Sequence, residues 1–164
     1  MNDREELLLH FSQVLGLVGR EDKHLMAVKD RFFGQVESVD AAWLETILAT
    51  PEGVDRLESF VGKFTRMQDT VMDKLVPLFL KIMGEPVGAA IDNLNRMEKL
   101  DFIQCADEWI ELRYLRNRLV HEYMEDAEVM AMALGRARSL MEVMHQTYVL
   151  VRNKVDSVQV SSAI

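Results

Sequence analysis

The chain contains few cysteine, proline and aromatic residues. It has one cysteine, Cys105, three prolines among 164 residues, and 7% aromatic residues. A single cysteine excludes an internal disulfide and is typical of a protein in a reducing cytoplasm, where we expect this one to act. No apolar run approaches the ~20 residues that span a bilayer. The acidic start, residues 1–6, does not resemble a secretory leader, so we expect no contact with a membrane.

The chain also lacks an excess of positive charge, since its net charge is −8. Proteins that hold long nucleic acids by their phosphates are usually basic. The charge therefore argues against a nucleic-acid role. If the protein acts on RNA, it should do so through a small basic focus in an acidic body, or with help from a protein partner.

Metal-site and cofactor-site patterns are missing too. Three histidines are scattered without ligand spacing, and no cysteine pair accompanies them: His10, His24 and His145. The glycines are isolated from one another, so no glycine-rich phosphate loop is present. No serine or cysteine has the surroundings of a nucleophile. We therefore expect no metal and no cofactor.

What the chain does contain is helical periodicity. Apolar residues recur at three- and four-residue spacing in several stretches, and eleven methionines suit helical cores. We predict helices over 3–18, 22–33 (a second helix, or a continuation after a break at Gly19), 41–48, 51–82, 89–97, 102–123 and 126–155. Asp40, Thr50, Asp101 and Asp126 are the predicted N-caps. Pro77 is expected to kink the long middle helix.

This pattern predicts an all-α fold, an up-and-down helical bundle with an extra N-terminal helical segment. The length fits one domain. Within it we expect an N-terminal helical extension, residues 1–50, packed on the bundle. Residues 51–156 should form the bundle itself, and residues 157–164 a flexible tail.

One stretch, residues 112–123, gathers the side chains that bind phosphate and transfer protons. It reads Leu-Arg-Tyr-Leu-Arg-Asn-Arg-Leu-Val-His-Glu-Tyr. Arginine offers a planar charged fork to phosphate oxygens, and histidine titrates near neutrality. The candidate catalytic residues are Arg116, Asn117 and His121. The candidate substrate-binding residues are Arg113, Arg118 and Tyr123.

Helical geometry limits how this stretch can work. At ~100° per residue, Asn117 and His121 share a face of a regular helix, whereas Arg116 and His121 diverge by ~140°. Either the helix loosens near Val120, or two chains bring their motifs together.

The stretch resembles the motif of HEPN-domain proteins, in which Arg, four residues, His, one residue and Tyr follow one another. Arg116, Asn117, His121 and Tyr123 carry the resemblance, which covers residues 105–125. The most similar branch is the HepT-type toxins, which are encoded beside minimal nucleotidyltransferase antitoxins. The resemblance implies a helical bundle, a homodimer with facing motifs, RNA as substrate and a cognate nucleotidyltransferase as partner. It also implies that Tyr123 is a site of nucleotide attachment.

The activity that the resemblance implies is metal-independent endoribonuclease cleavage. The ribose 2′-hydroxyl attacks the adjacent phosphate, with His121 as general base or acid. Arg116 stabilises the developing charge and Asn117 orients His121 or the phosphate. Tyr123 contacts the nucleotide or supports His121. A dimer would supply one histidine as base and the other as acid.

Two other interpretations remain open. The protein could be a non-catalytic HEPN module that binds nucleotide or RNA and partners a nucleotidyltransferase, or a purely structural helical dimer. In the structural interpretation, Arg113 and Arg118 pair with Glu111, Glu122 or acids of neighbouring helices. The long middle helix also carries a polar stripe, which consists of Arg66, Asp69 and Asp73. This stripe is either solvated or supports the motif from a neighbouring helix.

Residues 1–50 have no counterpart in the compact toxins. They would cover the site, extend the dimer or bind the antitoxin.

Overall fold

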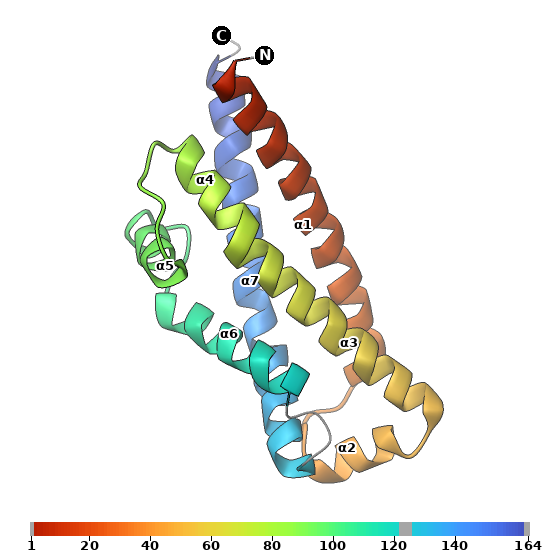
Figure 1. Cartoon of the computed structure of the whole chain (residues 1–164). Helices are drawn as coiled ribbons and strands as arrows, with labels where there is room; N and C mark the ends of the chain where they lie inside the picture. Colours follow the sequence, from red (N-terminus) through yellow and green to blue (C-terminus); the bar gives the residue numbers. More distant parts are fainter. Residues whose placement is uncertain (1, 122–125, 163–164) are drawn as a thin grey trace.

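The structure is a computed structural model that describes residues 2–121 and 126–162, and within them all regular secondary structure is helical. The predicted all-α bundle is confirmed. Three long rods run along the molecule: α1 (Asp3–Phe33), the continuous run α3 (Pro51–Thr70), η1 (Val71–Leu75) and α4 (Val76–Ile82), and α7 (Ala127–Ser162) (Figure 1). The shorter α6 (Ala106–His121) is inclined to α7 and packs beside it. The short helices α2 (Ala41–Leu48) and α5 (Ala90–Lys99) join them. No described helix is both long and apolar enough to cross a membrane.

Three of the predicted helix starts are confirmed by side-chain hydrogen bonds. The Asp40 carboxylate accepts from the backbone N–H of Trp43 at 2.8 Å, and the Thr50 hydroxyl accepts from the N–H of Gly53 at 3.0 Å. The Asp126 carboxylate accepts from the N–H of Glu128 at 2.9 Å. Each bond satisfies a donor that the first turn of a helix leaves open.

The fourth predicted cap, Asp101, is wrong. Asp101 has a positive φ of 62° and ends α5, because the N–H of Phe102 donates to the carbonyl of Met97 at 3.0 Å. This is the hydrogen-bond pattern of a left-handed helix C-terminus, a conformation that Asp tolerates. Helix α6 begins later, at Ala106, whose N–H donates to the Glu98 carboxylate at 2.6 Å.

The predicted break at Gly19 is also wrong, since α1 is one continuous helix. A Cβ atom at Gly19 would lie 2.6 Å from the Tyr148 hydroxyl of α7. The glycine therefore allows α1 and α7 to approach closely and does not end a helix. At the other end of the chain, α7 continues to Ser162, beyond residue 155 where we expected it to stop.

Pro77 changes the middle helix in a different way from the expected kink. The backbone widens into a π-helical turn, Val71–Leu75, just before it, and the N–H of Val76 donates to the carbonyl of Val71. Proline supplies no N–H, and its ring crowds the carbonyl four residues earlier, that of Asp73. A π turn is one way to accommodate the missing hydrogen bond and the crowded carbonyl. The rod continues past it in nearly the same direction (Figure 1).

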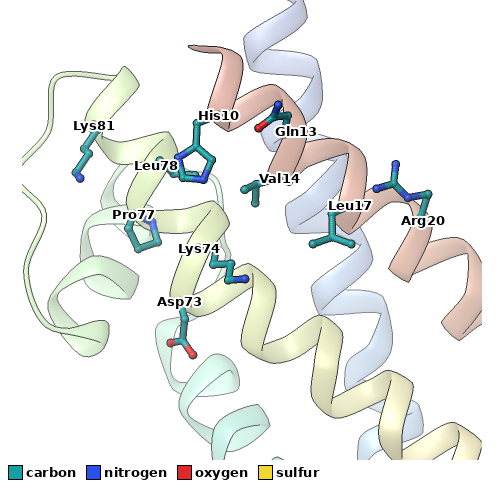
Figure 2. A pocket seen from close by; sticks show the side chains of 10 residues that line it. All are labelled: His10, Gln13, Val14, Leu17, Arg20, Asp73, Lys74, Pro77, Leu78 and Lys81. Carbon is teal, nitrogen blue, oxygen red and sulfur yellow. The ribbon is translucent and has the colours of Figure 1, made fainter. Parts of the chain in front are cut away.

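One hydrophobic core unites the rods. Phe32 of α1 stacks on Phe60 of α3 with ring centroids 5.4 Å apart, and Phe33 stacks on Trp43 of α2 at 5.7 Å. Trp109 of α6 is fully buried in the same cluster. Residues of the N-terminal fifty therefore contribute directly to the core. Outside the core, a groove of about 520 Å³ separates α1 from α4 (Figure 2).

We expect Gly53→Ala to lower the free energy of unfolding by more than about 2 kcal/mol, because overpacking against rigid backbone is costly. The added Cβ would lie 1.9 Å from the carbonyl oxygen of Ile47. Gly62→Ala, in the same helix, is the matched control: no atom lies within 4 Å of its added Cβ. That variant should be more stable by about 0.5–1 kcal/mol. Urea denaturation followed by circular dichroism measures both, and equal effects would contradict the packing argument.

Candidate functional site

Burial of one face of α6 fixes where the motif side chains point. Its inward residues are at most 5% exposed: Trp109, Leu112, Leu115 and Leu119. Arg113 and Arg116 lie at the edge of this face, beside α3. Asn117 is exposed and lies ~100° further around the helix than Arg116, toward the outer face of α6. The motif therefore extends from an edge that contacts α3 to a face that is open to solvent.

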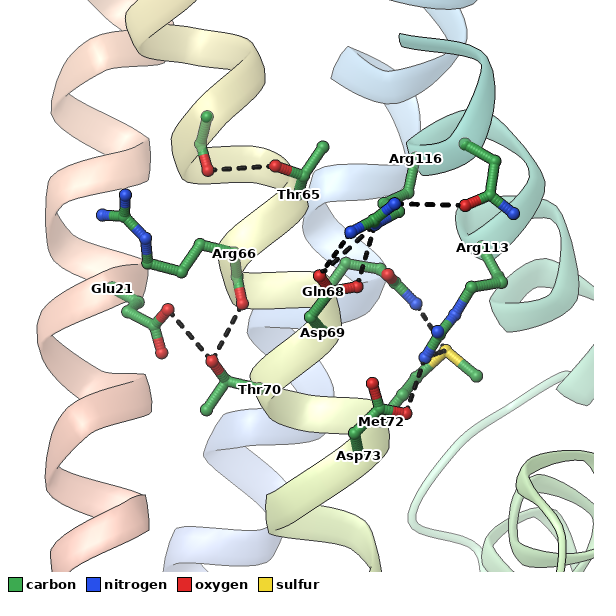
Figure 3. A network of polar contacts seen from close by, with 12 residues as sticks. Glu21, Thr65, Arg66, Gln68, Asp69, Thr70, Met72, Asp73, Arg113 and Arg116 are labelled. Carbon is green, nitrogen blue, oxygen red and sulfur yellow. Dashed lines mark hydrogen bonds and ion pairs between the residues drawn. The ribbon is translucent and has the colours of Figure 1, made fainter. Parts of the chain in front are cut away.

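Arg116 is held by Asp69 in a two-pronged ion pair (Figure 3). Its Nε lies 3.1 Å from Asp69 Oδ1, and its Nη2 lies 2.9 Å from Oδ2. The hydrogen bonds to Asp69 raise the pKa of Arg116 above its ordinary value, against the opposing effect of partial burial. Both side chains are partly exposed, at 27% and 34%. Arg116 is thus permanently charged and fixed in direction, while its outer edge stays accessible.

Arg113 is held one turn further along by Asp73, with Nη2 2.8 Å from Oδ1. The buried amide of Gln68 connects the two ion pairs. With its nitrogen facing Asp69 and its oxygen facing Arg113, Gln68 donates to Asp69 Oδ1 at 2.9 Å and accepts from Arg113 Nε at 3.1 Å. The result is one polar network between α3, η1 and α6.

Asn117 joins the edge of this network, because Arg116 Nη1 donates to its side-chain oxygen Oδ1 at 3.3 Å. Arg118 lies over the ring of Tyr114, with 5.5 Å between the guanidinium carbon and the ring centroid. The backbone of His121 belongs to α6. The side chain of His121 and all of Tyr123 lie outside the described residues.

Helix α6 is regular up to His121, so it does not loosen at Val120. The backbone positions of residues 116 and 121 therefore lie ~140° apart around the helix axis. Helical geometry allowed two arrangements, a helix that loosens near Val120 or two chains that bring their motifs together. The structure does not have the loosened helix.

Some partners of the motif were anticipated and others were not. Asp69 and Asp73 had been considered as support from a neighbouring helix, and they contact the motif arginines directly. Glu111 pairs with Arg136 of α7 at 2.8 Å and not with Arg113. Gln68 was missed, although a polar residue at a core position of an apolar stripe is the signal that could have identified it.

Comparison with protein-family models, with curated proteins and with solved structures found no match to this chain. The likeness to the HEPN motif therefore rests on residues 105–125, and activity and partners follow as proposals.

We expect the Asp69–Arg116 pair to show a coupling free energy of about 0.5–1 kcal/mol in a double-mutant cycle, because it is two-pronged but partly exposed. The cycle uses Asp69→Ala, Arg116→Ala and the double variant, with urea unfolding as the measurement. The Glu111–Arg136 pair provides a matched cycle on the opposite edge of α6. A coupling for Asp69–Arg116 below about 0.2 kcal/mol would mean that the pair does not fix Arg116.

Proposed function

We propose that this protein is a HEPN-type, metal-independent endoribonuclease that works as a homodimer. The observation that carries the proposal is the unbroken course of α6 through His121. Because Arg116 and His121 diverge on one helix, a single chain does not aim both at one phosphate. Two chains that pack α6 against α6 bring Arg116 of one and His121 of the other to a shared cleft.

The outer face of α6 supports this association. Ile110 and Tyr114, on the same face of this helix, are 40% and 58% exposed, so they form apolar surface that a partner could cover. Ile110, Tyr114, Asn117 and His121 follow one another at intervals of four, three and four residues. This is the spacing of a helix–helix seam, so a second copy would bury the apolar residues and bring the Asn117 and His121 positions close to the two-fold axis.

The proposed chemistry uses one histidine from each chain. One His121 takes the proton of the ribose 2′-hydroxyl, whose oxygen attacks the adjacent phosphorus. The partner's His121, in its protonated form, gives a proton to the departing 5′-oxygen. The products are a 2′,3′-cyclic phosphate and a 5′-hydroxyl. Arg116, already oriented by Asp69, stabilises the added negative charge without reorganising, and Asn117 orients the phosphate or the imidazole.

The same proposal extends to regulation. The motif resemblance implies that the chain is the toxin of a toxin–antitoxin pair, restrained by a nucleotidyltransferase. Tyr123 would be the residue that receives the nucleotide, and Arg113, Arg118 and Tyr123 would contact the substrate. A bulky anionic group on Tyr123, two residues from His121, would block the cleft and repel RNA.

One observation favours the non-catalytic alternative. Asp73 and Asp69 already neutralise Arg113 and Arg116, and this weakens their attraction for phosphate. A module that binds nucleotide or RNA for a partner nucleotidyltransferase would use the same residues without cleavage.

We expect the purified protein to cleave structured RNA or tRNA in EDTA and to leave 2′,3′-cyclic phosphate ends. His121→Ala should reduce the rate at least about 100-fold, the usual contribution of general acid–base catalysis. His145→Ala is the matched control, because His145 pairs with Asp22 between α7 and α1, away from the motif. Cleavage that survives in His121→Ala would contradict the role of His121. RNA binding without cleavage by the dimer would favour the binding module.

We expect Tyr114→Glu to convert the dimer into a monomer and to abolish cleavage, because it places a charge in the proposed seam. The variant should still fold, with an unchanged helical circular dichroism spectrum, since Tyr114 is 58% exposed within one chain. Leu150→Glu, at a 42% exposed position of α7, should stay dimeric and active. Light scattering after size exclusion measures the assembly. A dimer that persists in Tyr114→Glu would contradict the proposed interface.

A further inference from the structure

Three neighbouring pockets that share lining residues follow the α3–α4 rod, and two of them lie between this rod and α1; together we call them the groove. Besides the acids Glu21, Asp69 and Asp73, two rows of polar side chains line it: His10, Gln13, Arg20 and His24 from α1, and Lys63, Arg66, Lys74 and Lys81 from the rod. The two helices run in opposite directions, so His10 lies at the Lys81 end and His24 at the Lys63 end. At 1.5 Å per residue, the row from Lys63 to Lys81 is about 27 Å long.

The groove is positive although the protein is acidic. Five Lys or Arg side chains line it: Arg20, Lys63, Arg66, Lys74 and Lys81. Three acids lie on the same surface, and two of them, Asp69 and Asp73, are already paired with Arg116 and Arg113. In a chain of net charge −8, this surface is the small basic focus that an RNA-binding acidic protein would need.

Glu21 is a partly buried carboxylate among the cations of the groove. It accepts a hydrogen bond from the Thr70 hydroxyl at 3.1 Å, while its other oxygen is buried without a partner in the described part of the chain. Burial raises the pKa of Glu21, and the Thr70 hydrogen bond and the charges of Arg66, Lys74 and Arg20 oppose this rise. Arg20 and Arg66 line the same pocket as Glu21, so this carboxylate balances part of the positive charge of the groove.

The shape and lining suit one polymer strand better than a surface or a folded partner. The groove is elongated and concave, with Leu17, Pro77 and Leu78 between the charged rows (Figure 2). Among the described residues no Phe, Trp or Tyr lines it, and its only rings that could stack on bases are those of His10 and His24. Recognition would therefore depend mainly on backbone phosphates, which makes it largely indifferent to sequence. A lipid bilayer is too flat to enter such a groove.

The groove also lies next to the motif. Lys74 follows Asp73 directly, and Arg66 is one turn from Asp69, so the groove cations and the acids that hold the motif arginines belong to the same turns of the rod. Figure 3 shows Glu21 and Arg66 on one side of α3 and Arg113 and Arg116 on the other. A strand that leaves the groove has to cross only one helix to reach Arg116.

We propose that this groove is an RNA-binding track, which holds the phosphodiester backbone of a single-stranded segment beside the cleavage site. The choice of RNA as occupant rests on the proposed nuclease function. The track supplies the phosphate affinity that the paired motif arginines lack. It also assigns a role to α1: the N-terminal helix forms one wall of the substrate site.

The test is RNA binding in the full-length His121→Ala protein, which keeps the probe intact. A fluorescein-labelled, unstructured 16-nucleotide RNA is titrated and followed by anisotropy at several salt concentrations. Arg66→Glu with Lys74→Glu should weaken binding by about tenfold or more, and removal of two phosphate contacts should lower the salt slope by about 1.4. Lys99→Glu with Lys154→Glu, the matched control on α5 and α7, should change affinity less than about twofold. Glu21→Gln, which removes a negative charge from the groove, should tighten binding.

The outcomes separate this proposal from the nuclease proposal. Groove variants that bind RNA like the control would overturn the track, even if the protein with native His121 cleaves RNA. Groove-dependent binding without cleavage would support the track and count against the nuclease. Failure of the parent protein to bind the RNA at low salt would overturn the track. Groove-dependent capture of polyglutamate or of phosphatidylserine vesicles in preference to RNA would overturn it as well.

Discussion

The rod from Pro51 to Ile82 has to pack against α1 on one side and α6 on the other, and the division of its surface determines the rest of the molecule. Its apolar stripe, with Phe60 and Phe64, enters the core. Only a narrow polar strip remains. Within it, Asp69 and Asp73 turn toward α6, while Arg66 and Lys74 turn toward α1. The motif arginines and the basic groove are therefore neighbours because they share one helix.

The ion pair between Asp69 and Arg116 has two opposing effects. It fixes the guanidinium and keeps it charged, which suits the stabilisation of a transition state. It also supplies a negative charge beside the proposed phosphate site, which would weaken ground-state binding. A separate source of affinity would resolve this conflict. The cations of the groove would hold the RNA backbone, so that Arg116 is free to act mainly where charge develops.

Helix α6 also separates the motif residues, because they lie on different parts of its surface. Its inner face is fixed by Trp109 and the leucines that follow it, so the motif cannot rotate as a unit. Arg116 lies at the α3 edge, whereas Asn117 lies on the outer face beside the exposed Ile110 and Tyr114. One chain thus places positions 116 and 121, the two halves of the motif, on different faces of α6. In the proposed dimer, each cleft is completed by complementary halves from two chains, and activity then depends on assembly.

The sequence by itself determined the helices and most of their starts, because the caps at Asp40, Thr50 and Asp126 are hydrogen bonds between near neighbours. It also located the motif. The predicted helix break at Gly19 was wrong, because this glycine lies against Tyr148 within a continuous helix. The predicted N-cap at Asp101 was wrong as well, because this residue ends α5. Only the tertiary structure decided that Arg116 meets Asp69, 47 residues away, and that α1 closes a basic groove. Such contacts depend on how helices pack across the core, and the periodicity of one helix fixes its buried face but not its neighbour.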